Sequence, residues 1–299
     1  MTAPDAPATT PPAIEVNALS KRFGAVTAVD DVSFTITEHE AVVLWGANGA
    51  GKTTILRCIL GVIPFAGSIR VLGHDVRSCG KLARSHLGYV PQEIRLHGEQ
   101  TVAETASFYA RLRGVPLDRA TGLLEQWQLR DAMRRPVRGL SGGMKQKLAL
   151  VIALLADPPV LLLDEPTSNL DVRSQRDFSI LLEQLKRAGK TLLCCLHQLG
   201  DVWKLADRVI VLERGRCVQA GTPSAVIETL RDRAIVCVTV ARERIAEAAG
   251  LLEQQGFTVQ RNGMQMWVNV PAGRKVEPVR QLIEAGIPLL DLTMDEEPS

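Results

Sequence analysis

The segment AVVLWGANGAGKTT, residues 41–54, decides the fold of this chain of 299 residues. Residues 41–45 form a continuous apolar run, which is typical of a strand buried on both faces of a parallel sheet. The segment GANGAGKT (46–53) that follows has the pattern of a phosphate-binding loop, which stands between such a strand and a helix. We therefore expect a helix to begin at about Lys52, with a phosphate group bound just before it.

The residues of this loop suit a nucleoside triphosphate, ATP, together with Mg²⁺. Glycines let backbone N–H groups curl around phosphate oxygens, Lys52 can reach the β- and γ-phosphates, and the Thr53 hydroxyl can ligate Mg²⁺. The alternative, a glycine-rich turn that holds no ligand, is far less frequent in a strand–loop–helix context. The residues expected to surround the phosphates are Gly46, Ala47, Asn48, Gly49, Ala50, Gly51, Lys52, Thr53 and Thr54.

Two adjacent carboxylates stand at the end of a second buried run, VLLLD (160–164). Asp164 suits the shell of a Mg²⁺ ion, and Glu165 suits the base that activates a water molecule for attack on the γ-phosphate. Ligands of open α/β sheets bind at the carboxyl ends of the strands, where this pair is expected. Such a pair could also cap the next turn, but the phosphate loop elsewhere in the chain favours the functional interpretation.

Short apolar runs separated by helical patterns indicate an α/β fold with a mostly parallel sheet covered by helices. Besides the two runs above, they occupy residues 87–90 and 191–197. Ahead of this core, residues 13–23 and 31–36 alternate as antiparallel strands do. Residues 208–221 are expected to form a hairpin that turns at Arg214–Gly215, and a helical insert at about 93–150 stands between two core strands.

The pattern changes after about residue 231. Six segments follow in the order β, α, β, β, α, β, which is the order of the ferredoxin-like split βαβ unit. We therefore predict three parts: a disordered tail over residues 1–13, a nucleotide-binding domain over 14–231, and a small C-terminal α+β domain over 232–299.

Composition excludes several classes of protein. Hydrophobic residues make up 46% and charged residues 23%, as in a globular protein with a sizeable core, and a net charge of +2 argues against a nucleic-acid partner. Six cysteines without a Cys-x-x-Cys pair fit a reducing cytoplasm. The longest apolar run, residues 148–156, is too short to span a membrane, and the N-terminal segment lacks the features of a signal peptide. Any work at a membrane would therefore need a partner.

A second helix start suited to an anion occurs in LSGGMKQ (140–146). Ser141, Gly142 and Gly143 open a predicted helix whose free N–H groups and dipole favour a negative charge. Together with Gln92 in YVPQE, SNLD (168–171) and His197, the motifs stand in the order found in the ATPase subunits of ABC transporters. The chain resembles that family over about residues 14–230.

This resemblance implies a P-loop NTPase fold: a RecA-like, mostly parallel core with an antiparallel β subdomain and a helical insert. It also implies roles for single residues. Phe23 would stack on adenine, Gln92 would contact Mg²⁺ and the attacking water, and His197 would contact the γ-phosphate. Catalytic roles would then belong to Glu165, His197, Gln92 and Lys52, and the metal shell to Thr53, Gln92 and Asp164.

The same resemblance implies that the second helix start binds the γ-phosphate of an ATP molecule held by a second subunit. The residues involved would be Ser141, Gly142, Gly143 and Gln146, with Asp171 in the loop that links the two sites. Two chains would thus form a head-to-tail homodimer around two sandwiched ATP molecules. Its partners would be integral membrane permease subunits, which places the chain in the cytoplasm on the inner face of the cell membrane.

Residues 88–115 and the βαββαβ tail resemble the bacterial exporter branch of the family, which includes drug and lipid exporters and ATPases of copper-enzyme maturation. The alternative is a soluble ABC ATPase that acts on nucleic acid, the ribosome or iron–sulfur assembly. Such proteins carry a long coiled coil or a second cassette, and this chain shows neither pattern.

Several residues invite a chemical role but have a simpler interpretation. Cys194 and Cys195 should pack on opposite faces of a buried strand rather than bind metal or undergo redox chemistry. Met264 and Met266 are expected on one strand face, where packing is favoured over a copper site. His97 and Cys79 fit no motif and are expected on the surface.

Overall fold

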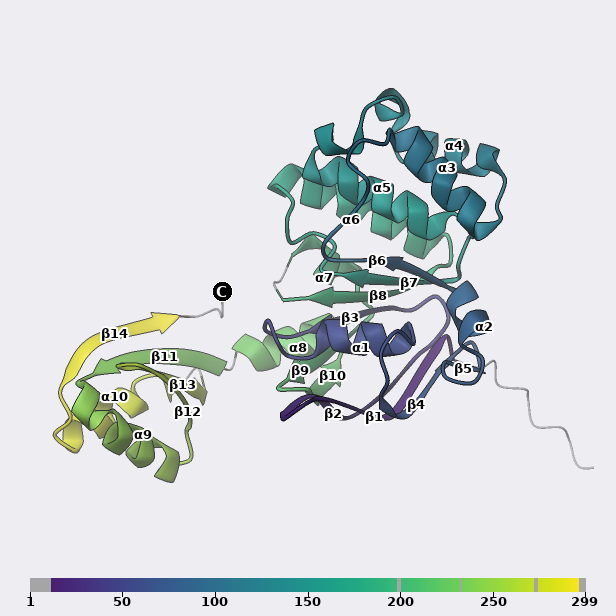
Figure 1. Ribbon diagram of the computed structural model, residues 1–299. Coiled ribbons are helices and arrows are strands. Elements are labelled where there is room, and N and C mark those ends of the chain that lie inside the picture. Colours follow the sequence, from purple (N-terminus) through teal and green to yellow (C-terminus); the bar gives the residue numbers. More distant parts are fainter. Residues whose placement is uncertain (1–11, 198–199, 232, 272–273, 296–299) are drawn as a thin grey trace, which may run out of the picture. The chain divides into compact units, whose positions relative to one another are not determined.

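The computed structural model describes residues 12–197, 200–231, 233–271 and 274–295. The chain divides into two compact units, Met1–Pro223 and Ser224–Ser299 (Figure 1). The predicted boundary near residue 231 falls at the end of helix α8 (Pro223–Arg231) and stays a prediction. The predicted tail over 1–13 lies, apart from residues 12 and 13, outside the described residues.

The central sheet of the first unit is mostly parallel, with the strand order β10-β9-β3-β8-β7-β6. Its strands are β3 (Ala41–Trp45), β6 (Leu87–Val90), β7 (Val160–Asp164), β8 (Thr191–Leu196), β9 (Arg208–Glu213) and β10 (Arg216–Gly221). Every residue of β7 and β8 is buried, which explains why these segments are apolar without alternation. Strand β10 pairs antiparallel with β9 through the predicted turn, where Arg214 (φ 49°) and Gly215 (φ 81°) are both left-handed. The predicted parallel core and hairpin are confirmed.

A second, antiparallel sheet has the order β2-β1-β4-β5. Its strands are β1 (Ile14–Phe23), β2 (Val26–Ile36), β4 (Ala66–Val71) and β5 (His74–Asp75). Helix α1 (Lys52–Ile59) contributes Ile55, Leu56 and Ile59 to one hydrophobic cluster with Val16 of β1 and Leu44 of β3. One core therefore joins the two sheets through α1. This packing holds the start of α1 beyond the carboxyl end of β3.

The remaining helices of this unit include the expected helical insert, which Figure 1 shows beyond the β6 side of the central sheet. They are α2 (Gly80–Ser85), α3 (Val102–Arg113), α4 (Leu117–Gln126), the 3₁₀ turns η1 (Arg130–Ala132) and η2 (Val137–Gly139), α5 (Gly142–Leu154), α6 (Val172–Arg187) and α7 (Asp201–Leu205). Thr101 and Glu104 form a capping box that begins α3, and left-handed Gly114 ends it. Helices α3, α4 and α5 pack against one another, and α5 also packs on β6.

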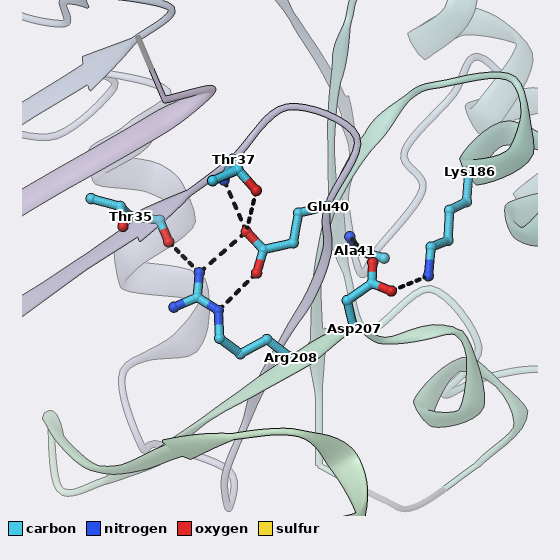
Figure 2. Close-up of polar contacts among 7 residues, drawn as sticks. All are labelled: Thr35, Thr37, Glu40, Ala41, Lys186, Asp207 and Arg208. Atoms are coloured by element: carbon cyan, nitrogen blue, oxygen red, sulfur yellow. Dashed lines mark hydrogen bonds and ion pairs between the residues drawn. The ribbon is translucent and has the colours of Figure 1, made fainter. Parts of the chain in front are cut away.

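Polar contacts fasten the end of β2 to the central sheet (Figure 2). Arg208 donates to the Glu40 carboxylate (Nε to Oε1, 2.7 Å) and to the Thr35 carbonyl, while Thr37 donates its N–H to Glu40 (2.8 Å). Beside them, Asp207 accepts from the Ala41 N–H (2.9 Å) and pairs with Lys186 (2.6 Å). Three segments distant in sequence therefore meet at the beginning of β3.

We expect Glu40→Gln to lower the free energy of unfolding at pH 7 by about 1–2 kcal/mol. Burial acts to raise the pKa of Glu40, but hydrogen bonds from Arg208 and Thr37 outweigh it, so the pKa lies below the ordinary 4.5. The stabilisation is therefore present above about pH 4.5 and is lost as the pH falls through the lowered pKa. Urea unfolding at pH 7 and at about pH 3.5 measures the difference, which should shrink at the lower pH.

Glu38→Gln is the matched control, because Glu38 is an exposed carboxylate in the same turn. That variant should unfold like the parent at both pH values. A Glu40→Gln difference that persists unchanged at low pH would contradict the assignment to the ionised carboxylate.

The second unit has one antiparallel sheet with the order β12-β13-β11-β14. After α8, its elements are β11 (Arg233–Val240), the 3₁₀ turn η3 (Arg242–Arg244), α9 (Ile245–Gln254), β12 (Thr258–Asn262), β13 (Gln265–Pro271), α10 (Glu277–Glu284) and β14 (Leu289–Asp295). Val238, Val268, Leu252 and Leu282 share one buried cluster between this sheet and its helices. The ferredoxin-like order expected from the sequence is confirmed.

The placement expected for the two methionines is wrong. Strand β13 begins at Gln265, so Met264 lies in the turn before it and is 46% exposed, whereas Met266 is fully buried. The two sulfur atoms therefore do not share a strand face, and the copper hypothesis loses its basis. Among the described residues no group of three or more His, Cys, Asp or Glu side chains is arranged to hold a metal ion.

The cysteines and His97 have the packed or surface positions that were expected for them. Cys194 and Cys195 are both buried in β8, and burial raises the pKa of Cys194 to about 12, which suits apolar packing. His97 and Cys79 are exposed. Of the helices within the described ranges, none is long and apolar enough to cross a membrane.

Candidate active site

The phosphate loop lies between the end of β3 and the first residue of α1, Lys52, as predicted. Two of its glycines have no room for a side chain. A Cβ at Gly46 would lie 2.3 Å from the Leu212 carbonyl oxygen, and one at Gly51 would lie 2.5 Å from the Ala28 carbonyl oxygen. Gly51 also has a φ of 104°, which L side chains rarely adopt. The fold thus requires glycine where the backbone turns to present its N–H groups.

The Lys52 ammonium group is enclosed by the loop that precedes it. Its side chain is 4% exposed and donates to the carbonyl oxygens of Gly46 (2.7 Å) and Ala47 (3.1 Å). It also forms an ion pair of 3.5 Å with Glu165. A buried cation held by two carbonyl groups and one carboxylate is arranged to attract phosphate oxygens.

The Glu165 carboxylate is the point where the predicted catalytic residues meet. Its Oε2 atom accepts from Gln92 Nε2 (3.0 Å) and lies 3.0 Å from His197 Nδ1, while Oε1 faces Lys52. The residue follows β7 directly and is 7% exposed. Its φ of 47° is left-handed, an unfavourable conformation for glutamate that is typical of functional sites. The structure therefore brings together Lys52, Gln92, Glu165 and His197 from four separate segments.

Thr53 and Asp164 offer oxygen atoms beside this carboxylate. The Thr53 hydroxyl donates to Asp164 Oδ1 at 3.0 Å. Burial raises the pKa of Asp164, although the hydrogen bond from Thr53 acts against it, and burial together with Asp164 raises the pKa of Tyr89 to about 12. A hydroxyl and a carboxyl oxygen are the ligand types that Mg²⁺ prefers, so these residues fit such an ion.

Ser141, Gly142 and Gly143 begin helix α5 as expected. Ser141 is the exposed cap residue, and its hydroxyl accepts from the Met144 N–H at 3.3 Å. Within the described ranges, no hydrogen bond or ion pair connects Ser141 or Asp171 to the phosphate loop of the same chain. The structure does not unite the two predicted half-sites in one chain.

The starts of helices α5 and α6 pack against each other. Asp171 caps α6 by accepting from the Ser174 N–H (3.0 Å) and hydroxyl (2.8 Å), and these bonds lower the pKa of Asp171. A Cβ at Gly143 would lie only 2.9 Å from the Ser174 hydroxyl oxygen. Glycine at this position therefore allows the close approach of the two helices.

Two further residues that the resemblance assigns to ATP differ in their exposure. Gln146 is buried in α5, where its Nε2 atom has no hydrogen-bond partner among the described residues, and it lines a cavity of about 340 Å³ with Gln92 and Glu165. Phe23 ends β1 and is 48% exposed, with Lys21 Nζ 4.7 Å from its ring centre.

Sequence reasoning did not identify Gln175, although it borders the site. This residue lies in the first turns of α6 and lines a small cavity of about 80 Å³ together with Glu165 and His197. A glutamine on an amphipathic helix usually faces solvent, so no sequence signal marked it. A hollow of about 620 Å³ beside α6 and α7 is lined by none of the predicted site residues.

The comparisons with known proteins agree with this geometry. Residues 29–168 match the family described as ABC transporter. The chain is 37% identical over 221 residues to the Nod factor export ATP-binding protein I of Ralstonia nicotianae, an alignment that covers 72% of this chain and 69% of that protein.

Solved structures share the fold of the first unit. The cbiO1 protein from Clostridium perfringens, part of the ABC transporter complex cbiONQ, matches with a TM-score of 0.67 and 25% identity over 81% of this chain and 99% of that chain. A dimeric bacterial ABC transporter cassette matches with a TM-score of 0.64 and 24% identity over 70% of this chain and 98% of that chain. The chain under study belongs to the ATP-binding subunits of ABC transporters, the ATPases whose hydrolysis of ATP is coupled to transport.

Proposed function

We propose that this ATPase drives a separate membrane-spanning permease as an exporter, with Glu165 as the base of the hydrolysis step. The observation that carries the proposal is the convergence of Lys52, Gln92 and His197 on the Glu165 carboxylate beside the phosphate loop. Glu165 would accept a proton from the attacking water, while Lys52 would stabilise negative charge on the phosphates.

Thr53, Asp164 and Gln92 would hold the Mg²⁺ ion, which would neutralise charge on the β- and γ-phosphates when bound. His197 would contact the γ-phosphate, and Phe23 would provide the aromatic surface for adenine. The exposed ring of Phe23 at the end of β1 is consistent with stacking.

The start of α5 would complete the site of a second copy of the chain. Ser141 and Gly142 are exposed and Gly143 is half-buried, and their helix end attracts an anion. Within the described residues of the same chain, they make no hydrogen bond or ion pair with the phosphate loop. Asp171 and buried Gln146 would support this face from behind. Two chains would then close head to tail around two ATP molecules.

The proposed permease would bind the surface formed by the Gln92 segment and the helical insert. Phe108 and Leu112 are one turn apart on α3 and are 52% and 69% exposed, so they form an exposed apolar patch on the described part of the first unit. The relative from Ralstonia nicotianae is named for Nod factor export, which supports the exporter direction and a location on the inner face of the membrane. No observation favours the soluble alternative. The second unit would serve as an accessory domain.

Purification of the tagged chain from detergent-solubilised membranes tests the proposal. We expect a multi-span membrane protein to co-purify with the parent, and Phe108→Asp with Leu112→Asp to reduce its recovery about tenfold without loss of ATP binding. Ile283→Asp is the matched control, because Ile283 is also an exposed apolar residue on a helix, α10. Recovery of ribosomes or nucleic acid in place of a membrane protein would contradict the proposal.

A further inference from the structure

The loop between Glu165 and Asp171 connects the proposed base to the residue that caps α6. Hydrogen bonds to the backbone carbonyl groups of this loop hold its conformation. Leu170 donates its N–H to the Thr167 carbonyl (3.2 Å), which closes the loop into a turn. Glu165 depends on this turn, because its carbonyl oxygen accepts from both the Ser168 N–H (3.2 Å) and the Ser168 hydroxyl (3.1 Å).

Gln175, which lies outside the loop, forms two hydrogen bonds that hold this turn. Its Nε2 group donates one hydrogen bond to the Thr167 carbonyl (3.2 Å) and another to the Leu170 carbonyl (3.0 Å), so both amide protons are used. The residue sits on α6, whose buried side chains Phe178 and Leu182 anchor the helix in the core. The two bonds therefore tie the loop to a rigid element.

The conformation of Glu165 makes this support necessary. Its left-handed φ of 47° persists only where the surrounding structure holds the backbone in place. On the N-terminal side, the Glu165 N–H donates to the Cys195 carbonyl of β8 at 3.1 Å. On the C-terminal side, the support is the turn that Gln175 holds.

We propose that Gln175 is a positioning residue for ATP hydrolysis, which holds the Glu165 carboxylate in place through the Thr167–Leu170 turn. The proposal rests on the role of Glu165 as the base. The turn that Gln175 holds leads directly into Asp171 and Ser174, and the Gly143 end of α5 packs against Ser174 in the same chain.

Gln175→Met tests the proposal, because methionine keeps the length of the side chain but has no N–H groups. We expect kcat for phosphate release to fall roughly 10- to 100-fold, as for a small displacement of a catalytic group. Binding of a fluorescent ATP analogue to the isolated chain should stay within about twofold of the parent, since Gln175 does not touch the phosphate loop. Gln184→Met is the matched control: an exposed glutamine on the same helix, whose replacement should leave kcat unchanged.

A double variant separates positioning from a general structural effect. If Gln175 acts through Glu165, adding Gln175→Met to Glu165→Gln should change the residual turnover by less than about twofold. A further decrease equal to that seen in the parent would overturn the proposal, as would parent-like turnover of Gln175→Met. Parent-like turnover of Glu165→Gln would instead overturn the proposed base, and the two failures are thus distinguishable.

Gln175→Lys keeps the test available if the methionine variant does not fold. The ammonium group donates hydrogen bonds at the end of an unbranched side chain and can replace the amide at both carbonyl groups. We expect turnover within about threefold of the parent, because the donors rather than the amide itself are required. A loss of 10-fold or more in folded Gln175→Lys, at unchanged binding of the ATP analogue, would overturn the proposal.

Discussion

Replacement of Glu165 by glutamine is expected to slow ATP turnover by roughly 10²-fold or more. The amide matches the carboxylate in size but cannot accept a proton from the attacking water at neutral pH. The phosphate loop and Lys52 are unchanged, so ATP should still bind, and a dimer that hydrolyses slowly should accumulate in the ATP-bound state. Phosphate release measures the turnover, and size-exclusion chromatography with ATP measures the dimer.

Glu183→Gln serves as the control for this experiment. Glu183 is a surface residue in an i,i+4 pair with Arg187, and its loss should have little effect on turnover. If Glu165→Gln hydrolyses ATP at a near-normal rate, a group other than Glu165 must accept the proton. The carboxylate would then have a structural role as the partner of Lys52, Gln92 and His197.

The variant Ser141→Arg is expected to lose ATP turnover almost completely while each monomer still binds ATP. Ser141 is exposed at the start of α5, so the fold should accommodate arginine. The long side chain would, however, occupy the space in which the γ-phosphate of the partner's ATP is proposed to lie. Turnover and the ATP-dependent dimer should therefore be lost together, with the affinity of the monomer for an ATP analogue preserved.

Ser85→Arg is the matched control, because Ser85 is an exposed serine at the end of another helix, α2. Mixing inactive Ser141→Arg chains with inactive Glu165→Gln chains adds a positive test. In a mixed dimer, one site combines an intact Glu165 with an intact Ser141, so the mixture should regain turnover. Full activity of a strictly monomeric protein would contradict the shared site.

The parallel strands and the phosphate loop could be predicted because their residues leave few alternatives. A run such as VLLL (160–163) is apolar at every position only when both faces of the strand are covered, and all four residues are indeed buried. The glycines at 46 and 51 mark places where a carbonyl oxygen leaves no room for a Cβ. Asp164 and Glu165 could be placed at the site because the first ends such a strand and the second directly follows it.

The missed and misplaced residues depend on contacts between segments distant in sequence. Gln175 matters through two carbonyl groups of a preceding loop, and no pattern along the helix distinguishes it from exposed Gln184. Met264 was expected on the strand face of Met266, but the strand begins one residue later, at Gln265, and Met264 belongs to the turn before it. Such boundaries are set by tertiary pairing rather than by local preference.

The left-handed backbone of Glu165 has a consequence for how this protein can change over time. Glycine or asparagine would relieve the unfavourable φ at this position, although either would leave buried Lys52 without its carboxylate partner. Selection for a relaxed backbone alone would therefore disfavour the residue proposed to perform the chemistry. Retention of glutamate requires selection for ATP hydrolysis. At this single residue, backbone stability and activity are therefore in conflict.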